Sequence, residues 1–382
     1  MAEYYEIKDV DEKYMRLCLE LAEEGASRVS PNPMVGAVIL DRDGNMVGLG
    51  HHKEYGGPHA EIFALREAGD NAKDGTLYIN LEPCCHHGKT PPCVNAVINS
   101  GIKRVVIGMV DPNLRVAGRS VELMKAAQIE VTTGVLEKES IELNKAFYKY
   151  HTTGFPLVVS KIAMTLDGKI ATRTQSSQWI NSDESRMLSH HWRNRFDAII
   201  TGSSTIISDD SRLTCRIPGG RDPVRIVIDS KLRTSPDAKV YTVESLSPAI
   251  LVTSFKYEGD QLKPYGKNKN VTIYKSPLTE DGKINLPNLL RYLATEHRIL
   301  SIILEAGPTL NGVMLKEGLV DKYYVFVAPK IVGDKNAYSS IDGIGTLDIN
   351  NAIQLHEVKT RQIGDDILIK AWVKDEFRRL NQ

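Results

Sequence analysis

The sequence has few cysteines, no net charge and no long apolar run. Its five cysteines in 382 residues are an odd and sparse set, which excludes the disulfide framework of a small secreted protein and favours a reducing compartment. No apolar run approaches the roughly 20 residues that cross a membrane, and the first residues lack the apolar core of a signal peptide. Lysine plus arginine equals aspartate plus glutamate at 48 each, so no basic surplus favours nucleic acid. We therefore expect a cytoplasmic protein without a membrane or nucleic-acid partner.

The length indicates more than one domain. A chain of 382 residues exceeds one ordinary core, and 42% hydrophobic with 25% charged residues is typical of globular proteins. The sequence contains no internal repeat and no low-complexity tract. A turn-rich break at residues 151–156 includes Gly154 and Pro156 and separates a helical run from a new strand. The expected domains are residues 1–152 and 153–382.

The first half alternates helices with strands. A helix is expected over residues 11–25, and Asp43-Gly44-Asn45 between two apolar runs predicts a hairpin. The other predicted helices and strands cover residues 60–68, 75–82, 94–99, 103–109, 129–131 and 137–150. This order predicts a sheet between helices, with a site at the ends of its strands.

The second half shows the same alternation. Its short runs of branched apolar residues predict a largely buried parallel sheet, with strands over residues 157–162, 198–201, 224–228, 250–253, 271–274, 299–304 and 323–329. Helices are expected over residues 182–195 and 286–296. A final hairpin is expected from residues 353–361 and 367–373, turning near Gly364.

Four residues of the first half form the pattern of a catalytic zinc site, namely His59, Glu61, Cys84 and Cys93. One imidazole and two thiolates leave the fourth zinc position open, which is typical of catalytic sites. Zinc lowers the pKa of water to about 7, and Glu61, which is not a ligand, is placed to move the protons. This H-x-E…P-C…C order is the signature of zinc nucleobase deaminases.

A structural zinc site and a disulfide are the alternatives to a catalytic zinc. A structural site needs a fourth nearby ligand, which His86 or His87 could supply, and Cys85 could replace its neighbour as a ligand. Neither alternative gives a reason for Glu61, so the catalytic interpretation is preferred.

Longer motifs make the sequence resemble a known family. They are SPNPMVG at residues 30–36, EPCCHHGKTPPC at 82–93, DPN at 111–113, KIAMTLDGK at 161–169, SQW at 177–179, DD at 209–210, VIDS at 227–230 and EAGPTL at 305–310. Together they resemble the bifunctional riboflavin-biosynthesis deaminase/reductase family over nearly the whole chain. The resemblance implies an α/β protein with an N-terminal cytidine-deaminase-like αβα sandwich and a C-terminal dihydrofolate-reductase-like α/β domain.

The resemblance implies two consecutive reactions. The first hydrolyses the amine of a diamino-phosphoribosylamino-pyrimidinone, with Glu61 relaying protons to the ring and to the departing ammonia. The second uses NADPH to reduce the ribosyl chain of the product to a ribityl chain. The implied cofactors are one Zn²⁺ per chain and NADPH. The implied partner is a small pyrimidine ribotide, and a homo-oligomer, either a dimer or a tetramer, is expected.

The resemblance also places substrate contacts in the first half, at Asn32, His52, His86, Lys89, Asp111 and Asn113. Lys89 would contact the phosphate, and a solvated surface lysine is the alternative. Two positions depart from the family pattern. Cys85 stands where serine is common, and a thiol is a weaker donor than a hydroxyl. Leu114-Arg115 stands where a proline is usual.

The residues of the second half say less by themselves. There is no G-x-G-x-x-G fingerprint, and the Gly307 turn indicates only that backbone N–H groups could face a phosphate. By resemblance, NADPH contacts are expected at Ala163, Trp179, Thr205, Asp209, Ser230, Gly307, Pro308, Thr309, Leu310, Asn311, Gly312 and Val313. Substrate contacts are expected at Ser177, Arg193, Leu213, Arg216 and Glu305. Trp179 could instead be a core aromatic.

Lys161 is the predicted catalytic residue of this half, placed to polarise or position the sugar carbonyl. Arg193 and Arg216 suit phosphate chemically, because the arginine fork matches phosphate oxygens. The hydride itself comes from the cofactor, so the protein positions and polarises.

Three other functions fit parts of the pattern. Another zinc nucleobase deaminase with an inactive or unrelated second domain would share the zinc motif, although such enzymes usually carry Cys-x-x-Cys. A binding protein with a structural zinc would not need Glu61. A degenerate second half would leave a deaminase that consumes no NADPH.

Overall fold

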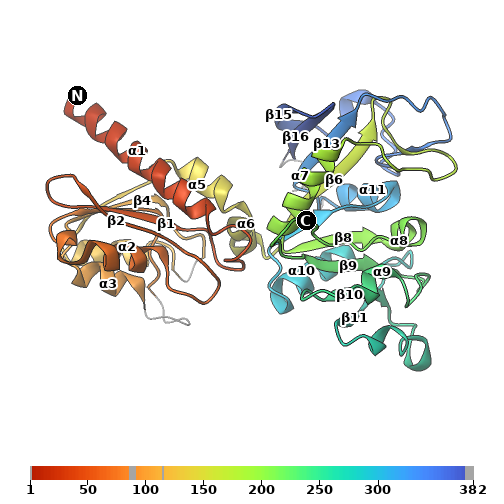
Figure 1. The fold of residues 1–382 in the computed structure, drawn as a ribbon, viewed down its shortest axis with the longest axis horizontal. Coiled ribbons are helices and arrows are strands. Elements are labelled where there is room, and N and C mark those ends of the chain that lie inside the picture. The colour runs from red at the N-terminus through yellow and green to blue at the C-terminus, as the bar shows by residue number, and fades with distance from the viewer. Residues whose placement is uncertain (1, 86–91, 114–115, 375–382) are drawn as a thin grey trace. The chain divides into compact units, whose positions relative to one another are not determined.

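The computed structural model describes residues 2–85, 92–113 and 116–374. The chain forms two compact units, Met1–Gly154 and Phe155–Gln382, both built from helices and sheets (Figure 1). Gly154 ends the last helix of the first unit with a φ of 76°, a conformation that glycine adopts without steric cost. Among the described helices, none combines the length and the apolarity of a membrane span.

The first unit contains a five-stranded sheet in the order β2-β1-β3-β4-β5. Its strands are β1 (Gly36–Leu40), β2 (Met46–His51), β3 (Thr76–Leu81), β4 (Arg104–Met109) and β5 (Glu130–Thr133). Strand β1 runs antiparallel to β2 and to β3, and the remaining pairs are parallel. The predicted hairpin and strands are therefore present, within a residue or two of the expected ends.

Helices cover both faces of this sheet. On one face, α1 (Ala2–Glu23) buries Met15 against Val38 and Tyr78. On the other face lie α2 (Ala60–Ala68), α3 (Cys93–Asn99) and α4 (Arg119–Ala126), which bury Ala64, Val97 and Met124 in a second cluster. Alternate residues of the strands supply the two clusters, as the period-2 geometry of a strand requires. The predicted αβα sandwich is confirmed.

The helical run predicted over residues 137–150 is present, with an interruption that was not predicted. The segment forms two helices, α5 (Glu137–Leu143) and α6 (Lys145–Thr153), which separate at Asn144. The Asn144 side chain is buried and hydrogen-bonds the backbone of Met34. An asparagine side chain can form hydrogen bonds with backbone groups in place of those of a helix. Here the Asn144 side chain binds the backbone of the distant loop that contains Met34.

The second unit contains a nine-stranded sheet in the order β11-β10-β9-β8-β12-β6-β13-β16-β15. The strands are β6 (Leu157–Thr165), β8 (Ala198–Gly202), β9 (Val224–Ile228), β10 (Ala249–Ser254), β11 (Val271–Ser276), β12 (Ser301–Leu304), β13 (Lys322–Ala328), β15 (Leu355–Ile363) and β16 (Asp366–Val373). The strands from β11 to β13 are all parallel, as predicted, and the β15–β16 hairpin adds an antiparallel edge. Two strands that are too short to show a sequence pattern, β7 (Lys169–Ala171) and β14 (Tyr338–Ser339), form a separate pair.

Helices also cover both faces of the larger sheet. On one face, α7 (Asp183–Arg195), α8 (Ser203–Asp209) and α9 (Lys239–Thr242) bury Trp192, Ile206 and Tyr241. On the other face lie α10 (Leu286–Glu296) and α11 (Pro308–Lys316), with Leu289 and Met314 in the core. The carboxyl ends of the adjacent parallel strands β9, β8, β12 and β6 meet at one edge, which is where ligands bind in open α/β sheets.

Candidate active sites

The structure brings His59, Cys84 and Cys93 together in the first unit. Their ligand atoms all lie within 4.8 Å of one another. The Nδ1 atom of His59 is 3.6 Å from the Cys84 sulfur and 3.2 Å from the Cys93 sulfur. His59 immediately precedes α2, Cys93 is the first residue of α3, and Cys84 follows β3. One imidazole and two thiols at this separation are a donor set that fits Zn²⁺ and leaves a fourth position for water.

All four titratable groups of this cluster, His59, Glu61, Cys84 and Cys93, have pKa values shifted from their ordinary ones. The pKa of the Cys84 thiol is lowered to about 4, chiefly because it accepts a hydrogen bond from Cys93 and lies against His59. Burial raises the pKa of Glu61, which lies in the first turn of α2 and is only 2% exposed. The Glu61 Oε2 atom has no hydrogen-bond partner within the described chain, so the fold itself does not use this oxygen.

His52 and Asn32 form a hydrogen-bonded pair beside the metal ligands. The Nδ1 atom of buried His52 lies 2.9 Å from the Pro58 carbonyl oxygen and must donate to it. Its Nε2 atom then accepts from the Asn32 amide at 3.0 Å. Burial lowers the pKa of His52, which keeps this arrangement neutral. The His52 and His59 rings lie edge to face with centroids 5.2 Å apart.

Two buried asparagines, which the sequence did not reveal as important, hold the loop that carries Asn32. Asn80 of β3 accepts from the Gly36 N–H at 2.8 Å and donates to the Met34 carbonyl at 3.1 Å. Asn144 accepts from the Met34 N–H at 2.7 Å and donates to the same carbonyl at 2.9 Å. Asn80 is a polar residue inside an otherwise apolar strand, and this exception is the feature of the sequence that could have indicated its role.

Glu82 anchors the loop that carries Asp111 and Asn113. Its buried carboxylate accepts three backbone N–H groups, from Asp111 at 3.1 Å, Gly118 at 3.0 Å and Ser120 at 2.9 Å. The Ser120 hydroxyl donates to the Pro83 carbonyl at 2.5 Å, next to Cys84. Asp111 in turn accepts the Asn113 N–H at 2.8 Å. The strand that leads to the thiols therefore also fixes the neighbouring loop.

Two predicted substrate contacts, His86 and Lys89, lie outside the described residues, as do Leu114 and Arg115. Cys85 is half-buried and packs against the core of the first unit. It is not one of the three clustered ligand residues.

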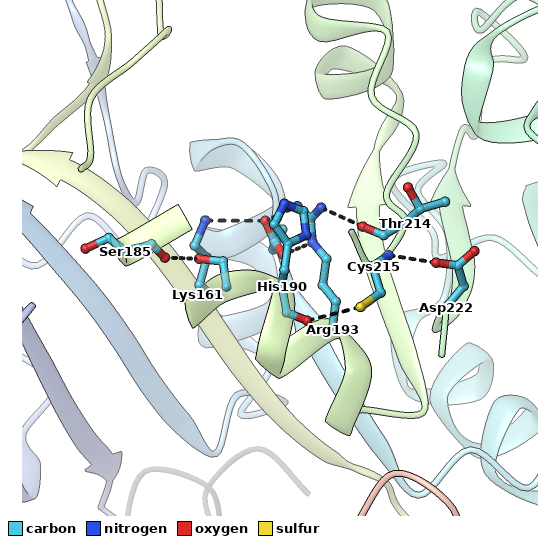
Figure 2. A network of polar contacts seen from close by, with 9 residues as sticks. Lys161, Ser185, His190, Arg193, Thr214, Cys215 and Asp222 are labelled. Carbon is cyan, nitrogen blue, oxygen red and sulfur yellow. Dashed lines mark hydrogen bonds and ion pairs between the residues drawn. The ribbon is translucent and has the colours of Figure 1, made fainter. Parts of the chain in front are cut away.

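In the second unit, Lys161 and Glu305 meet on neighbouring strands. The pairing of β6 with β12 places Leu304 opposite Ser160, so the next residues of the two strands lie beside each other. The Lys161 ammonium nitrogen is 3.4 Å from the Glu305 Oε2 atom. Arg193 of α7 forks onto the same carboxylate at 2.8 and 2.9 Å and also donates to the Thr214 carbonyl at 3.1 Å (Figure 2).

This arrangement keeps Glu305 ionised. Burial alone would raise the pKa of Glu305, but Arg193 and then Lys161 hold it well below its usual range. Three of the five N–H groups of Arg193 are therefore committed to protein atoms. The predicted contact of Arg193 with substrate stays a prediction, and in this structure the guanidinium of Arg193 forms two hydrogen bonds with the Glu305 carboxylate.

The other predicted substrate residues lie in loops. Leu213 is buried in the core of the second unit and has a φ of 59°, which a leucine rarely adopts. Arg216 is exposed and has no hydrogen-bond or ion-pair partner within the described chain. Ser177 is half-buried in the loop after β7.

Most of the predicted NADPH residues lie along the carboxyl edge of the sheet. Ala163 is near the end of β6, Thr205 is in α8 after β8, Ser230 follows β9, and Gly307 follows β12. Asp209 ends α8 and is exposed. Trp179 is 58% exposed, under the Arg186 guanidinium at 4.4 Å. The alternative of a core aromatic at Trp179 is therefore wrong.

Helix α11 contains the remaining predicted cofactor residues, from Pro308 to Val313. The side chain of buried Asn311 accepts from the Ser160 hydroxyl at 2.9 Å and donates to the Ala306 carbonyl at 2.9 Å. A Cβ on Gly312 would lie 1.6 Å from the Asp342 carbonyl oxygen. Leu310 and Val313 pack against the core. Their side chains thus hold α11 in place, and Pro308 and Thr309 form its first turn.

Comparisons with known proteins match both units. Residues 8–109 match the family described as the cytidine and deoxycytidylate deaminase zinc-binding region. Residues 156–369 match the RibD C-terminal domain.

Similar proteins match over nearly their whole length. The riboflavin biosynthesis protein RibD of Aquifex aeolicus is 42% identical over 365 residues, covering 95% of this chain and 98% of that protein. The Escherichia coli protein of the same name is 38% identical, covering 94% and 98%.

Solved structures agree with these matches. RibD of Acinetobacter baumannii has a TM-score of 0.86 at 33% identity, covering 96% of this chain and 99% of that one. A diaminohydroxyphosphoribosylaminopyrimidine deaminase/5-amino-6-(5-phosphoribosylamino)uracil reductase of Thermotoga maritima has a TM-score of 0.83 at 35% identity, with the same coverage. The predicted fold class is confirmed, and the chain belongs to the RibD family of bifunctional riboflavin-biosynthesis enzymes.

Proposed function

We propose that this chain catalyses the two reactions in the name of its Thermotoga maritima relative, namely deamination of the diaminopyrimidine ribotide and reduction of the resulting uracil ribotide. The observation that carries the proposal is the presence of two separate polar clusters in one chain. Buried Glu61 lies two residues from His59 of the His59, Cys84 and Cys93 group. In the second unit, Lys161 and Arg193 meet on the buried carboxylate of Glu305.

In the first reaction, His59, Cys84 and Cys93 would hold one Zn²⁺. Zinc bound there supplies Lewis-acid activation of water near neutral pH. Glu61 receives the proton and returns it to the ring nitrogen and the departing amine, a role that suits a buried carboxylate with a raised pKa. The pyrimidine would contact Asn32, His52, Asp111 and Asn113, and His86 and Lys89 complete the proposed set.

The anchors of the first site support this assignment. His52 fixes the Asn32 amide, while Asn80 and Asn144 fix the backbone two residues further on. Glu82 holds the loop that carries Asp111. Held side chains lose less entropy when a ligand binds, and this favours orientation of the ring.

In the second reaction, NADPH would bind at the ends of β6, β9, β8 and β12, through Ala163, Ser230, Thr205, Asp209, Trp179 and the segment Gly307–Val313. The cofactor supplies the hydride. Lys161 polarises the sugar carbonyl, Glu305 and Arg193 hold the lysine in place, and Ser177, Leu213 and Arg216 complete the substrate site. The Lys161–Glu305 contact supports the polarising role, because it fixes the ammonium beside the carboxyl end of β12.

The proposal extends to the organisation of the protein. The unit boundary at Gly154 supports a deaminase domain of residues 1–152 and a reductase domain of residues 153–382. We expect a homo-oligomer, a dimer or a tetramer, in the cytoplasm, and β15 at the sheet edge offers an exposed surface for a second copy. Light scattering measures the number of copies.

The test is a paired assay on zinc-replete protein with the diaminopyrimidine ribotide. Ammonia release is followed with and without NADPH, together with the absorbance of the reduced nicotinamide. Ammonia release followed by NADPH oxidation is the expected result. Ammonia release without NADPH oxidation would refute the reductase half, and the absence of both signals would refute the whole proposal.

A further inference from the structure

His190 lies in the polar network of the second unit, and no role has been assigned to it above. It stands three residues before Arg193 on α7, so the two side chains lie on the same helix face. Figure 2 shows both in one network. The Cys215 thiol donates to the His190 carbonyl at 3.5 Å, which ties this turn of α7 to the segment just before Arg216.

The state of the imidazole ring follows from its surroundings. Burial, then the cations of Arg193 and Arg216, lower the pKa of His190 to about 4, so the ring is neutral at neutral pH and carries a single N–H. Its Nδ1 atom is buried and has no hydrogen-bond partner within the described chain. A buried N–H without an acceptor is rarer in proteins than an unpaired acceptor. The proton is therefore assigned to Nε2, which makes this atom a donor.

The charges around His190 favour an anion. Lys161, Arg193 and Arg216 are its cationic neighbours, and Glu305 is its acidic one. Glu305 already receives Lys161 and the fork of Arg193. Arg216 forms no ion pair with an acidic side chain within the described residues, and Arg193 and Arg212 repel its charge. The Arg216 guanidinium and the His190 Nε2–H group are thus donors of this cluster that have no hydrogen-bond partner within the described residues.

We propose that His190 is a substrate-binding residue of the second site, which donates its Nε2–H to the phosphate of the ribotide beside Arg216. This proposal rests on the reductase function proposed above. A neutral imidazole suits the position, since it adds a donor without adding a fourth repelling charge. The predicted phosphate role of Arg193 would then pass largely to His190 and Arg216, because the Arg193 fork holds Glu305.

The test uses the full chain with His190→Ala, His190→Gln and the matched control His191→Ala, which changes the neighbouring exposed histidine. Ribose 5-phosphate is the binding probe, measured by calorimetry and as an inhibitor of NADPH oxidation. Loss of a hydrogen bond to a charged group weakens binding by roughly 10- to 100-fold. We expect His190→Ala to raise the KM of the uracil ribotide and the Kd of ribose 5-phosphate to that extent, with kcat changed less than about threefold.

The glutamine variant and a double variant complete the experiment. His190→Gln keeps an N–H donor and should recover part of the affinity, while His191→Ala should match the unmodified protein. The losses from His190→Ala and Arg216→Ala should be non-additive, because both residues contact one phosphate. A lower kcat with unchanged KM and unchanged ribose 5-phosphate binding would overturn the proposal. Calorimetry does not depend on turnover, so a protein that binds the probe through His190 but oxidises no NADPH would refute the reductase function and leave the phosphate contact standing.

Discussion

Lys161 and Glu305 approach within 3.4 Å from adjacent parallel strands, β6 and β12. The two residues are 144 positions apart in the chain, and the register of the sheet alone places them side by side. Arg193 reaches the same carboxylate from α7. The lysine is thereby held beside the carboxyl end of β12, where an open α/β sheet presents its ligand site.

Replacing Lys161 with methionine should abolish most NADPH oxidation and leave ammonia release intact. The loss should be on the order of 100-fold or more, because a charge that stabilises the transition state is removed. The control is Lys359→Met on the edge strand β15. Equal loss of both activities would point to unfolding instead, and a circular dichroism melt distinguishes the two cases.

Replacing Cys84 or Cys93 with serine should remove the zinc, whereas Cys85→Ser should retain it. Serine is a poor zinc ligand compared with a thiolate, and the Cys85 sulfur is not part of the ligand cluster. Metal analysis of the purified variants measures the stoichiometry. If Cys85→Ser lost the zinc and Cys84→Ser retained it, Cys85 would be the zinc ligand and Cys84 would not.

Replacing Glu61 with glutamine should keep the zinc and reduce the rate of ammonia release by roughly 100- to 10,000-fold, the usual contribution of a positioned general acid–base. Glu67→Gln is the matched control, since Glu67 lies on the same helix but is exposed. The proton-relay role is falsified if Glu61→Gln deaminates at the rate of the control.

Replacing Glu82 with glutamine should weaken the loop that carries Asp111 and Asn113. The amide has one acceptor oxygen where the carboxylate offers two, so some of the three bound N–H groups lose their partner. We expect the deaminase KM to rise about tenfold, since each lost hydrogen bond costs roughly 1–3 kcal/mol, while zinc content stays unchanged. An unchanged KM would show that the loop keeps its position without this anchor.

Replacing Asp11 with alanine should destabilise the first unit. Asp11 accepts two hydrogen bonds of 2.8 Å from Arg104 and one of 3.0 Å from Tyr78, and its side chain is 6% exposed. Breaking a buried pair on one side costs roughly 3–5 kcal/mol. Glu130→Ala is the control, because this second partner of Arg104 is 70% exposed and should contribute about 1 kcal/mol or less. Urea denaturation of the two variants measures the difference.

The sequence predicted the helices and strands better than it predicted the buried side chains that hold the loops of the sites in place. Residues 60–68, 224–228 and 286–296 form the expected elements without a shift of either end, because helix stops and branched apolar runs are local signals. The break at Asn144 depends on the Met34 backbone, 110 positions away, and no local pattern contains it. His59, Cys84 and Cys93 were predictable because they form a sequence motif. The supporting roles of Glu82, Asn80 and His190 were not predictable from the sequence. Their importance depends on partners that only the folded chain brings near.

The hydrogen bonds between Asn144 and Met34 bear on how the protein can be divided for separate expression. The zinc-binding match ends at residue 109, and the sheet of the first unit ends with β5 at Thr133. A fragment cut after either point would contain all three thiol and imidazole ligands but lose one of the two side chains that hold the Met34 backbone. It should therefore bind metal yet present Asn32 poorly, and a useful deaminase fragment has to extend beyond Asn144.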